Sequence, residues 1–222
     1  MILCHNLAMQ ISVSIEPFLH AGKDDLKQYI EEIIALSDKF AAENQQISLH
    51  FDYFQANSEI FQLVQGYVNR IPIDLHLMSE AATSVTGFRS VCFDAQEIKH
   101  GSNEAITANW RAVENGQFGL VLDLGYQVQD YQDLIRRASY VIVMTVKCGR
   151  SGQVFQSSPL ELVAQIREIN PEIKVIIDGG VNENNVFLLK KAGVDIAVVG
   201  NYAKKCYENG NFGVGINRLL RD

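Results

Sequence analysis

Short apolar segments recur along the whole chain, and a polar stretch follows almost every one of them. Eight of these segments are candidate strands, because they are short, rich in β-branched residues and apolar on both faces, as buried parallel strands are. They span residues 11–15, 47–53, 73–78, 90–95, 118–125, 140–146, 174–180 and 196–201. A regular alternation of strands with helix-like stretches predicts a parallel sheet with right-handed crossovers.

The stretches between the strands have the spacing of amphipathic helices. In residues 24–44, apolar side chains recur at i, i+4, i+7 and i+8, which places them on one helix face. These side chains are Leu26, Ile30, Ile33 and Ile34. Further helices are predicted over residues 103–115, 159–169 and 182–192. Pro159 suits the first turn of a helix, and Asn182 suits an N-cap.

Eight units of one strand and one helix most simply close into a (β/α)8 barrel, the TIM barrel of the α/β class. The chain has 222 residues, inside the range of about 200 to 250 that one such barrel occupies. No linker or low-complexity tract interrupts the series, so we predict a single domain over residues 1–222. An open doubly wound sheet is the alternative. It is disfavoured because no GxGxxG motif follows the first strand and because polar residues cluster at many strand ends.

Composition excludes several classes of partner. The net charge of −7 argues against nucleic acid, whose phosphates are bound by excess Lys and Arg. No apolar run reaches the ~18 residues of a membrane span, and the first ten residues lack a basic segment followed by a long apolar one. The four cysteines are far apart in the sequence, which indicates neither a disulfide framework nor a zinc ribbon. We therefore expect a cytoplasmic protein with no nucleic-acid or membrane partner.

Polar side chains at the predicted strand ends form a candidate metal site. His50 and Asp52 lie toward the end of the second predicted strand, His76 lies in the third, and Asp178 comes just before Gly179 and Gly180 at the end of the seventh. Residues two apart on a strand point to the same face, and the carboxyl ends of barrel strands meet at one mouth. Two imidazoles and two carboxylates suit one divalent ion, Zn²⁺, Fe²⁺, Mn²⁺ or Co²⁺, with positions left for substrate oxygens.

Glycines follow the last three predicted strands. Gly149 and Gly152 come after the sixth, Gly179 and Gly180 end the seventh, and Gly200 is in the eighth. Loops after strands seven and eight of such barrels commonly hold phosphate through backbone N–H groups at a helix N-terminus. This pattern predicts a small phosphorylated ligand.

The motifs together resemble the ribulose-phosphate 3-epimerase family. The resemblance covers nearly the whole chain and is carried by ISVSIEPF with Ser14, LHFD (49–52), DLHLM (74–78), VMTVKCGRSGQVF (143–155), IIDGGV (176–181) and VVGN (198–201). It implies a ribulose-phosphate-binding type of barrel that inverts C3 of a ketose phosphate, such as D-ribulose 5-phosphate to D-xylulose 5-phosphate, in the pentose phosphate pathway. Members of this family usually associate, which implies a homo-oligomer.

The resemblance also implies roles for individual residues. His50, Asp52, His76 and Asp178 would hold the metal, and Asp52 and Asp178 would be the two acid/base groups that remove and return a proton on opposite faces of the carbon, through a metal-stabilised enediolate. The substrate would be bound by Ser14, Met78, Met144, Gly149, Ser151, Gly152, Gly179, Gly180, Gly200 and Asn201.

The surroundings of these residues depart from the family pattern. Residues 53–56 read YFQA where the family has VMDG, the loop after strand six reads CGRSGQ in place of PGFGGQ, and Cys92 stands where a histidine is common. These changes predict retained chemistry with a shifted substrate, and Cys92 is predicted to be a buried structural thiol. Two alternatives remain. A lyase of the hexulose-phosphate-synthase type is disfavoured because Leu75 and His76 interrupt its DxKxxD motif. A non-catalytic barrel that binds a sugar phosphate or a metal is the other.

Overall fold

The computed structural model of the chain describes residues 9–53, 58–78, 85, 87–100, 118–149 and 152–221. Eight parallel strands close into a barrel in sequence order, with β1 paired to both β2 and β8. The strands are β1 (Gln10–Ser14), β2 (Ile47–Tyr53), β3 (Ile73–Leu77), β4 (Ser90–Asp94), β5 (Phe118–Leu122), β6 (Tyr140–Met144), β7 (Lys174–Asp178) and β8 (Ile196–Val199). The predicted TIM barrel is therefore confirmed, and the open sheet is wrong.

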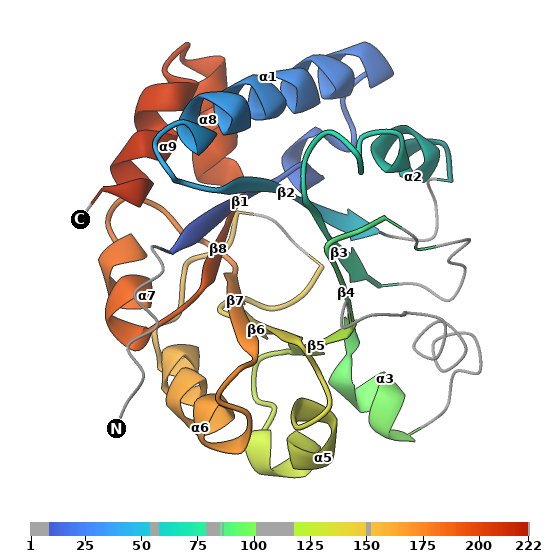
Figure 1. Cartoon of the computed structure of the whole chain (residues 1–222), viewed down its shortest axis with the longest axis vertical. Coiled ribbons are helices and arrows are strands. Elements are labelled where there is room, and N and C mark those ends of the chain that lie inside the picture. Colours follow the sequence, from blue (N-terminus) through green and yellow to red (C-terminus); the bar gives the residue numbers. More distant parts are fainter. Residues whose placement is uncertain are drawn as a thin grey trace.

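Helices cover the outside of the barrel (Figure 1). The α-helices are α1 (Lys23–Ala41), α2 (Ser58–Gln65), α3 (Ala95–His100), α5 (Gln132–Ile135), α6 (Glu161–Ile169), α7 (Val186–Ala192), α8 (Asn201–Glu208) and α9 (Phe212–Leu220). Short 3₁₀ turns are η1 (Glu16–Phe18), η2 (Val128–Tyr131) and η3 (Ser158–Leu160). The apolar face predicted for α1 is buried against the barrel. The helix predicted over residues 103–115 lies outside the described residues.

The start predicted for the seventh helix is wrong. α7 begins at Val186, because Asn182 lies in a turn in which its side-chain oxygen accepts the N–H of Asn184 at 2.9 Å. The side chain of Asn185 accepts the N–H of Asn182 at 2.9 Å. These local hydrogen bonds satisfy backbone groups without a helix, as asparagine side chains often do in turns. By contrast, Pro159 lies in η3, which leads directly into α6 as predicted.

Two kinds of side chain fill the interior of the barrel. Strands β4 to β8, together with Val146 just beyond β6, contribute an apolar cluster of Cys92, Val121, Ile142, Met144, Val146, Ile176, Ile196 and Val198. Cys92 is fully buried, as predicted, and it packs where a side chain on Gly119 would collide with its sulfur. Strands β1 to β4 instead bury a polar layer near their amino ends. It consists of Ser12, Ser48, Asp74 and Ser90, and Arg89 pairs with Asp74 within it.

Among the helices in the described part of the chain, none has both the length and the apolar character needed to cross a bilayer.

Candidate active site

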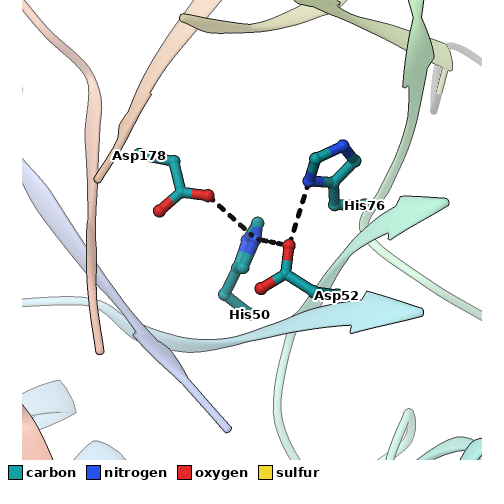
Figure 2. Close-up of side chains that lie close together, drawn as sticks. All are labelled: His50, Asp52, His76 and Asp178. Atoms are coloured by element: carbon teal, nitrogen blue, oxygen red, sulfur yellow. Dashed lines mark hydrogen bonds and ion pairs between the residues drawn. The ribbon is translucent and has the colours of Figure 1, made fainter. Parts of the chain in front are cut away.

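Four side chains converge at the carboxyl ends of three strands, and they are the four predicted metal ligands. His50 and Asp52 come from β2, His76 from β3 and Asp178 from β7 (Figure 2). Asp52 lies directly beside His76 because the register of β2 and β3 pairs these two residues. Each of the four offers one ligand atom, and these atoms all lie within 4.8 Å of one another. The structure thus brings the set to one point.

Asp52 is at the centre of the cluster. Its Oδ1 lies 2.9 Å from His76 Nδ1 and 3.3 Å from His50 Nε2, and the same His50 nitrogen lies 3.7 Å from Asp178 Oδ2. His50 is fully buried, whereas the side chains of Asp52 and Asp178 are 13% and 16% exposed. The two carboxylates are therefore the groups in the cluster most open to a ligand.

The charges in this cluster act strongly on one another. Burial lowers the pKa of His50, but the carboxylates of Asp52, Asp178 and Asp74 outweigh this effect and raise it to about 9. Burial raises the pKa of Asp52, but the imidazoles of His50 and His76 hold it well below its usual range.

Asp178 differs from Asp52 in this respect. Burial raises the pKa of Asp178 to about 6, helped by the charges of Asp52 and Glu16 and opposed by His50 and His76. Without a cation, the two carboxylates thus have very different proton affinities.

The donor set fits a divalent cation. Two imidazole nitrogens and two carboxylate oxygens form the mixed set that Zn²⁺, Fe²⁺, Mn²⁺ and Co²⁺ accept. His50 Nδ1 is buried and has no hydrogen-bond partner among the described residues, so this imidazole lacks the second polar contact that usually orients it. The type and the proximity of the four donor atoms nevertheless suit a metal ion.

A cavity of about 640 Å³ opens above the cluster. Asp52, His76 and Asp178 line it, whereas His50 lies beneath and does not. The predicted substrate residues that line it are Ser14, Met78, Met144, Gly149, Gly152, Gly179, Gly180, Gly200 and Asn201. Ser151, the remaining member of that prediction, is outside the described residues, as is Arg150.

Two glycines allow the loops of this cavity to pack closely. Gly180 has φ +67°, and a Cβ there would lie 2.8 Å from the backbone nitrogen of Phe155 in the loop after β6. Gly152 has φ +79°, and a Cβ there would lie 3.3 Å from Asn201 Nδ2 at the start of α8. The loops after β6 and β7 and the first turn of α8 thus form one continuous wall, which explains the late glycines in the sequence.

Several cavity residues were missed by the sequence analysis. They are Glu16, Val146, Lys147, Gln153, Val181, Asn182, Glu183, Asn184, Val198, Tyr202 and Lys205, whereas Cys148, in the altered loop after β6, lines the cavity as its place beside the site suggested. Lys147 and Glu16 come shortly after strand ends, so their positions relative to β6 and β1 could have drawn attention to them. Lys205 lies in the second turn of α8, and no strand-end rule points to it.

A closed parallel barrel with a cluster of side chains that could hold a metal ion and a glycine-lined cavity at its strand carboxyl ends defines the class of protein: a TIM-barrel enzyme. The ribulose-phosphate 3 epimerase family model matches residues 52–203. The chain therefore belongs to the ribulose-phosphate 3-epimerase family, which is a family of isomerases.

Individual relatives agree with this assignment. The chain is 29% identical over 155 residues to ribulose-phosphate 3-epimerase of Helicobacter pylori, a match that covers 62% of this chain and 67% of that protein. It is 30% identical over 167 residues to the enzyme of the same name from Aquifex aeolicus, covering 69% and 75%.

A solved structure shares the fold. A crystal structure of KGPDC from Streptococcus mutans superposes with a TM-score of 0.66 at 12% identity, and the match covers 95% of this chain and 97% of that one. At this identity, the likeness speaks for the barrel fold alone.

Proposed function

We propose that this protein is a metal-dependent epimerase that inverts C3 of a ketose phosphate, D-ribulose 5-phosphate or a related sugar. The observation that carries the proposal is the convergence of two carboxylates and two imidazoles at the mouth of the barrel, beneath a glycine-walled cavity. Membership of the epimerase family supports the same reaction class. With D-ribulose 5-phosphate as substrate, the protein would act in the pentose phosphate pathway.

Asp52 and Asp178 would be the two proton-transfer groups. Inversion of a carbon beside a carbonyl requires a base on one face and an acid on the other. Asp52 extends from β2 and Asp178 from β7, so they reach the cavity from different sides of the barrel (Figure 2). One carboxylate would remove the C3 proton while the other, protonated, returns a proton to the opposite face.

The histidines would hold these carboxylates in place. His76 Nδ1 contacts Asp52 at 2.9 Å, and His50 Nε2 lies between Asp52 and Asp178. His50, Asp52, His76 and Asp178 would bind the cation, which would supply electrophilic stabilisation to the oxygens on C2 and C3 of the substrate. Which of Zn²⁺, Fe²⁺, Mn²⁺ and Co²⁺ is used is a matter for metal analysis.

The rest of the cavity would position the sugar. Met78 and Met144 line the cavity and would provide apolar walls beside the reacting carbon, and Met144 pairs with Asp178 in the register of β6 and β7. The loop glycines and the first turn of α8 would receive the phosphate through backbone N–H groups. Ser14, whose Oγ accepts the N–H of Glu16 at 3.1 Å, would lie near the same end because it also approaches Gly200.

Solvent isotope exchange tests the reaction. The purified protein would first be analysed for bound metal and then incubated with D-ribulose 5-phosphate in deuterium oxide. We expect deuterium at C3 and formation of D-xylulose 5-phosphate. Bound metal and bound sugar phosphate without exchange would instead favour a non-catalytic barrel, and cleavage of a carbon–carbon bond would favour a lyase. Related ketose phosphates, including ketohexose 6-phosphates, would be assayed in parallel.

A further inference from the structure

Two lysine side chains line the cavity. Lys147 lies just beyond β6, and Lys205 lies in α8. Both residues are exposed, and neither has an ion pair or a side-chain hydrogen bond with another described residue. Lys204, the neighbour of Lys205, differs in its contacts and in its position. Its Nζ lies 3.7 Å from Glu208, 3.4 Å from the carbonyl of Pro17 and 5.3 Å from the ring of Phe18, and it does not line the cavity.

Both lysines belong to the glycine-rich side of the cavity. Lys147 begins the loop after β6, and its carbonyl accepts a hydrogen bond of 2.6 Å from Gln153 Nε2, which ties the two ends of that loop together. Lys205 lies one turn beyond Asn201, the first residue of α8. Helical side chains lean toward the N-terminus of their helix, which favours a position of the Lys205 ammonium over the first turn of α8.

The charge of the cavity gives these lysines a role. Four carboxylates line it, from Glu16, Asp52, Asp178 and Glu183, and Glu183 is paired with Arg218 at 3.1 Å. Asp52 and Asp178 belong to the cluster that can hold a divalent cation, which would balance their charge. Among the described residues that line the cavity, only Lys147 and Lys205 have a cationic lysine or arginine side chain. A phosphate dianion that enters this acidic region would be stabilised by them.

We propose that Lys147 and Lys205 bind the phosphate group of the substrate and select phosphorylated over unphosphorylated ketoses. The inference rests on the proposed function for its substrate class. A lysine ammonium acts on phosphate as a compact point charge that needs no fixed geometry. Since both residues contact the phosphate equally before and during the reaction, they contribute to substrate affinity and leave the chemical step unchanged. Their exposure makes the contribution dependent on salt.

Lysine-to-methionine variants test the inference. Lys147→Met, Lys205→Met and the double variant keep the length of the side chain and remove its charge, and Lys204→Met is the matched control. We expect each of the two cavity variants to raise KM for D-ribulose 5-phosphate roughly three- to tenfold with kcat unchanged, as for a partly screened charged contact. Inhibition by inorganic phosphate should weaken by the same factor, and the effect should shrink at high salt. Lys204→Met should change neither quantity.

The outcomes separate this inference from the proposed function. If the wild type turns over the substrate and the double variant has the same KM and the same inhibition by phosphate, the role of the lysines is overturned. The proposed function is not affected by that result. A fall in kcat at constant KM would also overturn the role of the lysines. If the wild type turns over no ketose phosphate, the proposed function fails, and calorimetric binding of inorganic phosphate then decides. Weaker binding in the double variant supports the lysines as an anion site, and equal binding rejects it.

Discussion

The guanidinium of Arg89 and the carboxylate of Asp74 form a paired, hydrogen-bonded contact inside the barrel. Arg89 Nε donates to Asp74 Oδ1 at 2.8 Å, and Arg89 Nη2 donates to Asp74 Oδ2. The hydroxyls of Ser12, Ser48 and Ser90 donate to the same carboxylate at 3.0, 3.2 and 2.8 Å. Charged Arg89 lowers the pKa of Asp74 against the effect of burial, so the acid remains ionised below the cluster of His50, Asp52, His76 and Asp178.

We expect Arg89→Met to destabilise the protein severely. It leaves the carboxylate of Asp74 buried without its cationic partner, a change that costs about 3 to 5 kcal/mol in free energy of unfolding. Urea denaturation followed by circular dichroism would measure this value. The control is Arg70→Met, which breaks an exposed bidentate pair with Glu31 and should leave the denaturation midpoint almost unchanged. Equal midpoints for the two variants would mean that the buried pair contributes nothing.

We expect Asp178→Asn to abolish turnover and to leave the fold intact. The amide keeps the shape of the side chain but cannot accept or return the C3 proton, and loss of an acid/base group typically lowers kcat by about 10² to 10⁴. Steady-state kinetics and thermal unfolding would be measured together, with bound metal determined in the same sample. Asp123→Asn, just after β5 and outside the four-residue cluster, is the comparison. Full activity of Asp178→Asn would remove this residue from the mechanism.

We expect removal of divalent cations to abolish activity and to lower Tm. A ligand that binds only the folded state stabilises it by about 2.7 kcal/mol at one hundred times its Kd, and that stabilisation is lost on chelation. Activity should return on addition of one of Zn²⁺, Fe²⁺, Mn²⁺ or Co²⁺. His50→Ala should reduce the response of Tm to added metal, because it removes one of four ligands. Full activity after exhaustive chelation would contradict the metal-dependent mechanism.

We expect Gly180→Ala to cost more stability than Gly193→Ala. Both glycines have positive φ, +67° and +78°, so alanine is strained at both positions. At Gly193 the added methyl meets nothing within 4 Å, whereas at Gly180 it meets the backbone of Phe155 at 2.8 Å. The difference between their unfolding free energies isolates the collision, at about 1 to 3 kcal/mol. Gly180→Ala should also raise KM, since it moves the wall of the cavity. Equal stabilities would mean that the loops separate freely.

Much of the fold follows from local patterns that the sequence displays directly. Each of the eight strands was predicted within a few residues, because buried parallel strands are short apolar runs separated by helices. The strands β5, β6, β7 and β8 each end two or three residues earlier than predicted. In β7, for example, Gly179 and Gly180 adopt φ +120° and +67°, conformations that cannot continue a strand.

The cluster of His50, Asp52, His76 and Asp178 was predictable for a related reason. Barrel closure places every strand end at the same mouth, so polar residues at strand ends must meet there. The partner of Arg89 and the position of Lys205 in the cavity were not predictable in this way. Arg89 precedes β4 and contacts Asp74 fifteen positions earlier, and Lys205 reaches the cavity from a helix face. Such contacts depend on tertiary packing, which no local periodicity encodes.

The four residues of the cluster come from distant parts of the chain, which has a consequence for assembly of the site. His50, Asp52 and His76 belong to the first half of the chain, whereas Asp178 belongs to the second, and they meet only because β8 joins β7 to β1. A chain released before its last strand would carry all four residues without the closed ring that brings Asp178 to the other three. Acquisition of a cation by all four would therefore report that the ring has closed, and it could be followed as a spectroscopic signal during refolding.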